Sequence, residues 1–130
     1  MRTSSLEIAS RFRKWIPLQT VNKQVLPPVP AVYVLKHIEG CFPRLIGESD
    51  ILKIGATTNL LRRIIREYVK GAGGETTKRI HRYLMDYGYM KKVELGFAEF
   101  RVDKCKPLER ELLQQYEEDH HELPPWNRSA

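Results

Sequence analysis

The sequence predicts an α/β domain of the α+β kind: a small antiparallel sheet of three strands flanked by helices, preceded by an N-terminal helical arm. The chain has 130 residues, a length that suits one compact domain. Hydrophobic residues make up 42% and charged residues 29%, so the chain can bury a core. Local patterns follow in the order strand, strand, helix, helix, strand, helix, which favours a sheet with separate helices.

The first thirty residues read as an appendage to this domain. Apolar residues at helical spacing predict a helix over residues 6–16, and Pro17 ends it. The Pro-Pro-Val-Pro stretch at 27–30 predicts a stiff, extended linker. We therefore expect a helical arm and linker in residues 1–30 and the folded domain in residues 31–130.

Strands are predicted where β-branched and aromatic residues cluster between turn signals. The first covers residues 32–37 and the second residues 51–55, with a glycine- and proline-containing loop between them. Two consecutive strands joined in this way most simply form an antiparallel hairpin. Residues 93–101 alternate loosely as a third strand, with Gly96 as a bulge position.

Helices are predicted from capping residues and apolar periodicity. A helix over 59–70 has Thr57 or Thr58 as its N-cap and Gly71 after its end. A second covers 77–87, and a third runs from about 107 to 121, with Pro107 in its first turn.

Composition excludes several classes of protein. The apolar run at residues 31–35 is far shorter than the roughly 20 residues of a membrane span. The N-terminus has no apolar segment of the secretory type. Cys41 and Cys105 have no CxxC spacing, and we expect reduced thiols in a cytoplasmic protein.

The charge is concentrated in the middle of the chain. The 22 basic and 16 acidic residues give a net charge of +6. Residues 53–92 hold ten basic and three acidic side chains, whereas residues 107–130 hold two and six. This distribution fits a phosphate-binding surface beside a helix with carboxylates, or two solvated faces of opposite sign that attract each other.

The predicted helix over 59–70 has a basic face. At about 100° per residue, its apolar side chains occupy one side. Arg63 lies near the centre of the other side, and guanidinium groups suit phosphate oxygens. The alternative is a solvated amphipathic helix. The polar face as a whole comprises Asn59, Arg62, Arg63, Arg66 and Lys70.

The last predicted helix places Glu109 in the middle of its apolar arc, among Leu108, Leu112 and Leu113. A carboxylate that points at a core is costly unless it is paired, protonated or bound to a cation. Two partners therefore remain open: a basic side chain in a structural ion pair, or a divalent metal ion.

Three further residues are candidates from their positions. Tyr33 lies in the middle of a strand, where tyrosine is usually a core residue. Lys53 is a charged residue within a short apolar strand and could simply face solvent. His81 lies at the edge of the apolar arc of the second helix, where a packed histidine is the common outcome.

Together these residues resemble the motifs of the GIY-YIG nuclease superfamily. Ala31-Val32-Tyr33 resembles the GIY tripeptide, and Lys53-Ile54-Gly55 resembles YIG. Arg63, after the polar turn at 57–59, matches the arginine of the family helix, and Glu109 matches the metal-binding glutamate. Asn127, after a pair of prolines, resembles the terminal asparagine. The resemblance covers roughly residues 30–127, and the predicted element order is also that of the family.

The resemblance implies metal-dependent hydrolysis of phosphodiester bonds. Glu109 would hold one divalent ion, Mg²⁺ or Mn²⁺, that polarises the scissile phosphate. Tyr33 would accept a proton from the attacking water, and Arg63 would stabilise charge on the phosphoryl oxygens. Lys53 would assist as an electrostatic partner, or as a base if burial lowers its pKa. His81 is a candidate for proton relay.

The implied partner is a nucleic acid, with DNA preferred to RNA by the resemblance alone. We expect Arg62, Arg66, Lys70 and Asn127 to contact it. Two departures from the motifs, Ala31 for glycine and Lys53 for tyrosine, keep a second hypothesis open, a nucleic-acid-binding module without hydrolysis. A third is a protein-interaction domain whose basic face binds an acidic partner.

Overall fold

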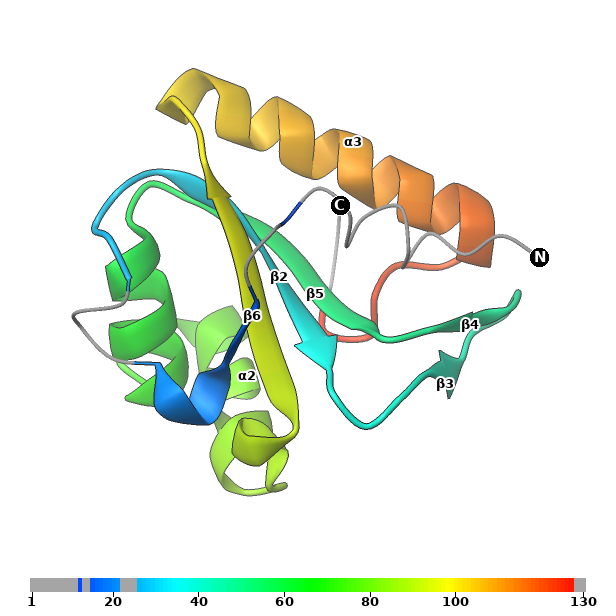
Figure 1. The fold of residues 1–130 in the computed structure, drawn as a ribbon, viewed down its shortest axis with the longest axis horizontal. Coiled ribbons are helices and arrows are strands. Elements are labelled where there is room, and N and C mark those ends of the chain that lie inside the picture. The colour runs from blue at the N-terminus through cyan, green and yellow to red at the C-terminus, as the bar shows by residue number, and fades with distance from the viewer. Residues whose placement is uncertain (1–11, 13–14, 22–25, 128–130) are drawn as a thin grey trace.

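The computed structural model describes residues 12, 15–21 and 26–127, and it has an α+β architecture (Figure 1). Within this part of the chain, four strands form an antiparallel sheet in the order β1-β6-β2-β5. Their bounds are Trp15–Pro17 for β1, Val93–Glu99 for β6, Ala31–His37 for β2 and Ile51–Thr57 for β5.

The sheet has one strand more than the sequence predicts. Trp15 and Ile16, expected at the end of a helix, pair with Gly96 and Leu95 in β1. The prediction of a helix is therefore wrong at these two residues, and the rest of residues 6–16, apart from Phe12, lies outside the described chain. Gly96 explains the pairing, because a Cβ there would stand 2.7 Å from the Trp15 ring.

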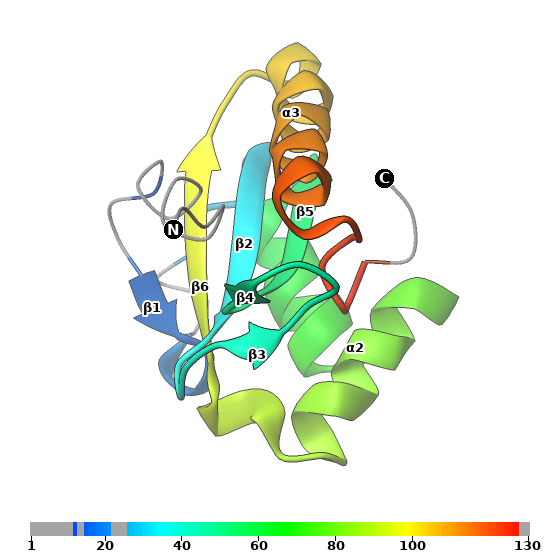
Figure 2. The ribbon, with the colours of Figure 1, turned by 90° about the vertical axis from the view of Figure 1, so that its right-hand side faces the viewer.

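Helices cover both faces of the sheet (Figure 2). On one face lie the π-helix η2 (Arg62–Val69) and the α-helix α2 (Glu75–Met85); on the other lies α3 (Val102–His120). Alternation along β2 divides its side chains between the two cores. Tyr33 faces η2 and α2, whereas Val32 faces α3.

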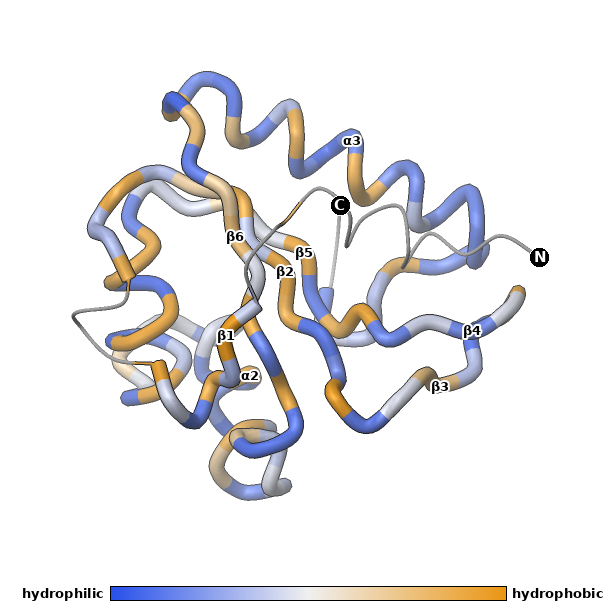
Figure 3. Tube along the Cα trace, in the orientation of Figure 1, coloured by the Kyte–Doolittle hydropathy of each residue, from blue (hydrophilic) through white to orange (hydrophobic). Residues whose placement is uncertain are grey.

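The helix α3 begins before its predicted start. It starts at Val102, so that Pro107 is its sixth residue and not its first. Hydrophilic and hydrophobic positions alternate along α3 in Figure 3, as expected for a helix with one face on a sheet. Among the described residues, no helix is long and apolar enough to cross a membrane.

The loop predicted between β2 and β5 contains a short ribbon, β3 (Phe42–Pro43) paired with β4 (Glu48–Ser49). The ribbon is fixed to the end of α3, where Ile46 donates its backbone N–H to the carbonyl of His120 at 3.2 Å. The short 3-10 helix η3 (Tyr89–Lys91) connects α2 to β6. A second short 3-10 helix, η1 (Leu18–Thr20), follows β1. Leu18 and Leu26, both within the predicted arm and linker, are buried in the core beside β2.

Candidate active site

Tyr33 occupies the centre of the sheet and is fully buried. It lies opposite Gly55 of β5 in the antiparallel register. A Cβ at Gly55 would stand 2.5 Å from the Tyr33 hydroxyl, so only glycine leaves room for the phenol there. Gly55 therefore provides the space that the Tyr33 phenol occupies.

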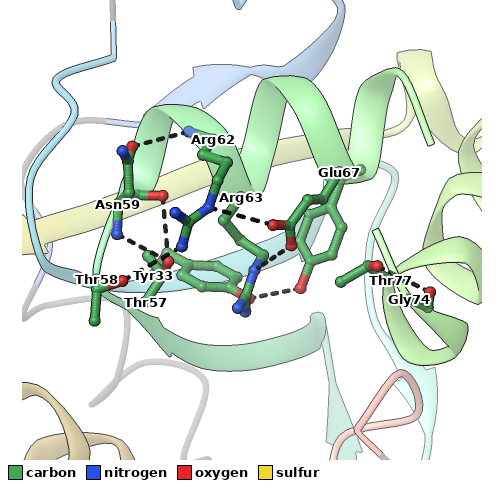
Figure 4. A network of polar contacts seen from close by, with 10 residues as sticks. Tyr33, Thr57, Thr58, Asn59, Arg62, Arg63, Glu67, Gly74 and Thr77 are labelled. Atoms are coloured by element: carbon green, nitrogen blue, oxygen red, sulfur yellow. Dashed lines mark hydrogen bonds and ion pairs between the residues drawn. The ribbon is translucent and has the colours of Figure 1, made fainter. Parts of the chain in front are cut away.

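A chain of polar contacts connects Tyr33 to the helix η2 (Figure 4). The hydroxyl groups of Tyr33 and Tyr68 are 2.5 Å apart, and Arg63 donates Nη1–H to the Tyr33 hydroxyl at 3.3 Å. Arg63 also donates Nε–H to a Glu67 carboxylate oxygen at 2.8 Å. The guanidinium of Arg63 is thus held on two sides, by a phenol and by a carboxylate.

The π winding of η2 makes this chain possible. In a π-helix the hydrogen bonds run from residue i to i+5, so residues five apart lie on the same side. Lys70 donates its N–H to the Ile65 carbonyl in this pattern. Arg63 and Tyr68, also five apart, therefore point to the same hydroxyl. The predicted α-helical arrangement, with Arg63 at the centre of an outward face, is wrong for this residue: its side chain is only 28% exposed.

Burial sets the protonation of the two phenols. The pKa of Tyr33 is raised because burial disfavours the phenolate, although Arg63 lowers it in part. Burial likewise raises the pKa of Tyr68, and the neighbouring Tyr33 adds to this effect. Burial disfavours the charge of Arg63, but the two tyrosines and Glu67 outweigh it and raise the arginine's pKa. The network is therefore two neutral phenols and a permanent cation.

Lys53 lies on the same face as Tyr33, two residues before Gly55. It pairs with Leu35 across the strands, at a bulge where Leu52 is the extra residue of β5. The pKa of Lys53 is lowered to about 8: burial is the largest cause, Glu109 opposes it, and Arg63 and Arg79 add to the lowering. A fraction of Lys53 is therefore neutral near pH 7.

Glu109 lies on α3 with its side chain 17% exposed, as its place in the apolar arc predicts. Its carboxylate raises the pKa values of both Tyr33 and Lys53. Its Oε1 accepts an ion pair from Lys106 at 3.3 Å, and Lys106 is 70% exposed. The sequence left two partners open for Glu109, a basic side chain or a metal ion, and the structure has a basic side chain, the exposed Lys106, in contact with it.

The side chains around Glu109 determine whether a divalent cation can bind there. Within the described residues, no group of three His, Cys, Asp or Glu side chains could hold a metal together. Mg²⁺ in phosphoryl-transfer sites, however, is usually held by one or two carboxylates, water and substrate phosphates. Glu109, whose side chain is partly exposed and pairs with the exposed Lys106, fits this mode.

A cavity of about 210 Å³ opens beside Arg63. Its walls combine the end of β5 and the following turn with the start of α3. Two threonines, Thr57 and Thr58, and two cationic residues, Arg63 and Lys106, line it, and Ala56, Val102 and Cys105 complete it. Hydroxyl donors and cations around a small cavity suit a phosphate group.

The other predicted basic residues lie farther along η2. Arg62 is drawn toward this network, with Nε 3.4 Å from Glu67 and Nη2 3.4 Å from the Thr58 hydroxyl. Arg66 and Lys70 are exposed and line a separate cavity of about 620 Å³ on the helix surface. The structure therefore divides the predicted basic face between the network and the outer surface.

Asn127 and His81 have structural partners. The Asn127 side chain accepts the Ile54 N–H at 3.0 Å and donates to the Ile54 carbonyl at 2.9 Å, like a neighbouring strand. His81 contacts the Tyr68 carbonyl through Nδ1 at 2.9 Å, and its ring lies against Gly71. His81 therefore supports the backbone of η2 behind Tyr68.

Sequence reasoning missed three participants. Glu67 lies four residues after Arg63, and this i,i+4 spacing was an available signal for their ion pair. Tyr68 carries no such signal, because only the π winding aligns it with Arg63. Arg79 is buried on α2 and donates to the Trp126 carbonyl at 2.8 Å and to the Tyr83 hydroxyl at 3.2 Å. The spacing of Arg79 and Tyr83, one helical turn apart, was the available signal.

Comparisons with protein-family models, with curated proteins and with solved structures find no match to this chain.

Proposed function

We propose that the protein is a metal-dependent endonuclease that hydrolyses phosphodiester bonds in DNA. The proposal is supported by four residues from four different elements, Tyr33, Lys53, Arg63 and Glu109, of which Arg63 contacts Tyr33 directly. Arg63 and Glu109 each act electrostatically on both Tyr33 and Lys53. The resemblance of the same four residues to GIY-YIG motifs supports the same chemistry.

The scissile phosphate would lie in the cavity beside Arg63. There the guanidinium can donate to the phosphoryl oxygens, where negative charge develops during hydrolysis. Lys106 and Thr58, which line this cavity, would orient the phosphate. Because Tyr33 and Glu67 already hold the guanidinium, little reorganisation accompanies the reaction.

Lys53 is a better proton acceptor than Tyr33. The Tyr33 hydroxyl is buried, contacts Tyr68 and Arg63, and has a raised pKa. Lys53 is partly exposed, and its pKa of about 8 lies near the working pH of a general base. In this proposal Lys53 takes the proton of the attacking water, and Tyr33 positions Arg63.

Glu109 would hold the divalent ion, Mg²⁺ or Mn²⁺, which when bound supplies Lewis-acid polarisation of the phosphate. The carboxylate would exchange its weak ion pair with Lys106 for this ligand. Lys106 would then be free to contact the phosphate, since it also lines the cavity.

The outer basic residues would bind flanking phosphates. Arg66 and Lys70 are exposed on η2, and Arg62 lies between them and the cavity. Contacts of this kind make binding fall steeply as salt rises. The preference for DNA over RNA rests on the resemblance.

A plasmid-nicking assay with Mg²⁺ or Mn²⁺ tests the proposal. Wild-type protein should nick supercoiled DNA, and Glu109→Gln should abolish nicking while folding is kept. Glu117→Gln is the matched control, because Glu117 is an exposed carboxylate of the same helix.

Two other results would favour the alternatives. Salt-sensitive DNA binding without nicking by the wild type favours a binding module, consistent with lysine in place of the motif tyrosine. Weak, salt-insensitive binding favours a protein-interaction domain.

A further inference from the structure

An aromatic pocket lies beside the start of β5, whereas the cavity beside Arg63 lies at the end of that strand. The pocket has a volume of about 220 Å³. Four of its lining residues have aromatic rings, and two are aliphatic. They are His37, Phe42, Leu52, Tyr89, Pro125 and Trp126. A planar ring system fits a space of this kind better than a flexible aliphatic chain does.

The rings stand around the space without closing it. Tyr89 meets Trp126 edge to face, with ring centroids 5.5 Å apart, and its centroid is 6.1 Å from that of His37. His37 lies 6.4 Å from Phe42. Phe42, His37 and Tyr89 are each half-buried, so part of each side chain is open to a ligand, and Arg44 stands over the Phe42 ring, 5.7 Å from its centre.

The bulge in β5 joins this pocket to the candidate active site. Leu52, the extra residue of the bulge, packs with the same core as Tyr33, and Lys53 follows it directly. From Leu52 to Ala56, at the cavity beside Arg63, is about 13 Å at the rise of a strand. About four stacked nucleotides cover this distance, and fewer cover it when the strand is extended.

Cations border the aromatic walls. The Lys92 ammonium stands 5.8 Å from the Tyr89 ring centre, and it pairs loosely with Glu39 at 3.8 Å. Arg79 holds the backbone of Trp126 from behind. Basic side chains beside exposed aromatic faces are the combination that binds single-stranded nucleic acid, with bases stacked on rings and phosphates near cations.

We infer that the aromatic pocket takes an unpaired nucleobase of the substrate, within a few nucleotides of the scissile phosphate. The base must be unpaired because both faces and the pairing edge of a duplex base are already occupied. This inference rests on the proposed function, in that it requires a nucleic-acid substrate. It specifies DNA with a single-stranded segment beside the cleavage point.

Binding of fluorescein-labelled DNA in EDTA tests the inference without cleavage. Three probes are compared: a blunt duplex, the same duplex with a short single-stranded overhang, and that overhang with abasic sites. Wild-type protein should bind the intact overhang roughly five- to a hundredfold more tightly than the blunt duplex. Abasic sites should remove the advantage, because they keep the phosphates and delete the bases.

Variants identify the pocket. Tyr89→Ala should reduce the preference for the overhang to within about twofold, and Tyr89→Leu, which keeps apolar bulk against the core, should do the same. Phe42→Ala should weaken it as well. Tyr87→Ala is the control, since Tyr87 is a 68% exposed tyrosine of the same region outside the pocket. Circular dichroism and melting curves verify folding.

Equal binding of the three probes by folded wild-type protein would overturn the inference, as would an unchanged preference in Tyr89→Leu. The nicking assay separates this result from failure of the nuclease proposal. Cleavage without a preference for the overhang refutes the inference about the aromatic pocket and supports the nuclease proposal. A preference for the overhang without cleavage supports the inference about the pocket and refutes the nuclease proposal.

Discussion

Replacing Tyr68 by phenylalanine tests whether the buried phenols position Arg63. The change deletes one hydroxyl, 2.5 Å from that of Tyr33, and leaves the apolar ring in the core. Loss of a buried hydrogen bond costs about 1 kcal/mol, and up to about 3 kcal/mol if Tyr33 is left without a second partner. For a domain of this size we expect the melting temperature to fall by roughly 3–10 °C.

The effect on catalysis has a separate signature. Without Tyr68 the Tyr33 hydroxyl can rotate, and Arg63 keeps only Glu67 as a firm partner. We expect kcat to fall about tenfold, because misplacement of a catalytic group by a fraction of an ångström raises the barrier. KM should stay within about twofold, since the charge of Arg63 is unchanged.

Tyr116→Phe is the matched control for this prediction. Tyr116 is as buried as Tyr68 but packs in the core beneath α3, with a hydroxyl influenced by Ser49 and Arg44. Melting curves should show destabilisation of Tyr68→Phe, and steady-state cleavage should show a loss of kcat in Tyr68→Phe and none in Tyr116→Phe. The reasoning is refuted if kcat falls equally in both, or if Tyr68→Phe loses stability and keeps full kcat.

Three further predictions concern the surroundings of this network. The rate of cleavage should rise with pH through about 8, because Lys53 accepts a proton only when neutral and its pKa is lowered to about 8. Lys53→Arg should be inactive at every pH. A wild-type rate that does not change with pH argues against Lys53 as the base. Lys106→Ala should increase the affinity for Mg²⁺, measured by calorimetry, up to about fivefold, because Lys106 competes for Oε1 of Glu109. An unchanged affinity argues against Glu109 as the metal ligand. Asn127→Ala should lower the free energy of unfolding in urea by about 1–3 kcal/mol, because both backbone groups of Ile54 lose a partner; a change below about 0.5 kcal/mol contradicts this role.

Features encoded by local patterns could be predicted from the sequence. The strands beginning at Ala31, Ile51 and Val93 follow runs of β-branched and aromatic residues, and their antiparallel pairing is as expected. The half-buried position of Glu109 follows from helical periodicity. The strands and the burial of Glu109 each depend on residues a few positions apart, so local sequence patterns are enough to predict them.

Features that depend on a distant partner could not be predicted. The strand β1 has three residues and an apolar spacing that equally suits a helix. What decides it is the space above Gly96, about eighty positions later, where the indole of Trp15 lies. A three-residue strand has no period of its own to detect.

The π winding of η2 is the error with the greatest consequence for the site. A helical wheel assumes an α-helix, and it separates Arg63 from Tyr68. The register of η2 is instead set by packing of Ile64 and Tyr68 into the core. No residue in the stretch marks that register, so the identity of the hydroxyl that contacts Tyr33 was not accessible.

Exposure separates the groups that can react from those that position them, and motif matching cannot make this distinction. Tyr33 and Tyr68 are at most 1% exposed and hold each other's hydroxyls, so neither can exchange a proton with an attacking water. Arg63 and Glu109 retain 28% and 17% exposure, enough to contact a phosphate or a cation. Lysine at position 53 is therefore compatible with the proposed hydrolysis: the Tyr33 phenol is committed to Arg63, and Lys53 is a partly exposed basic group with a pKa of about 8.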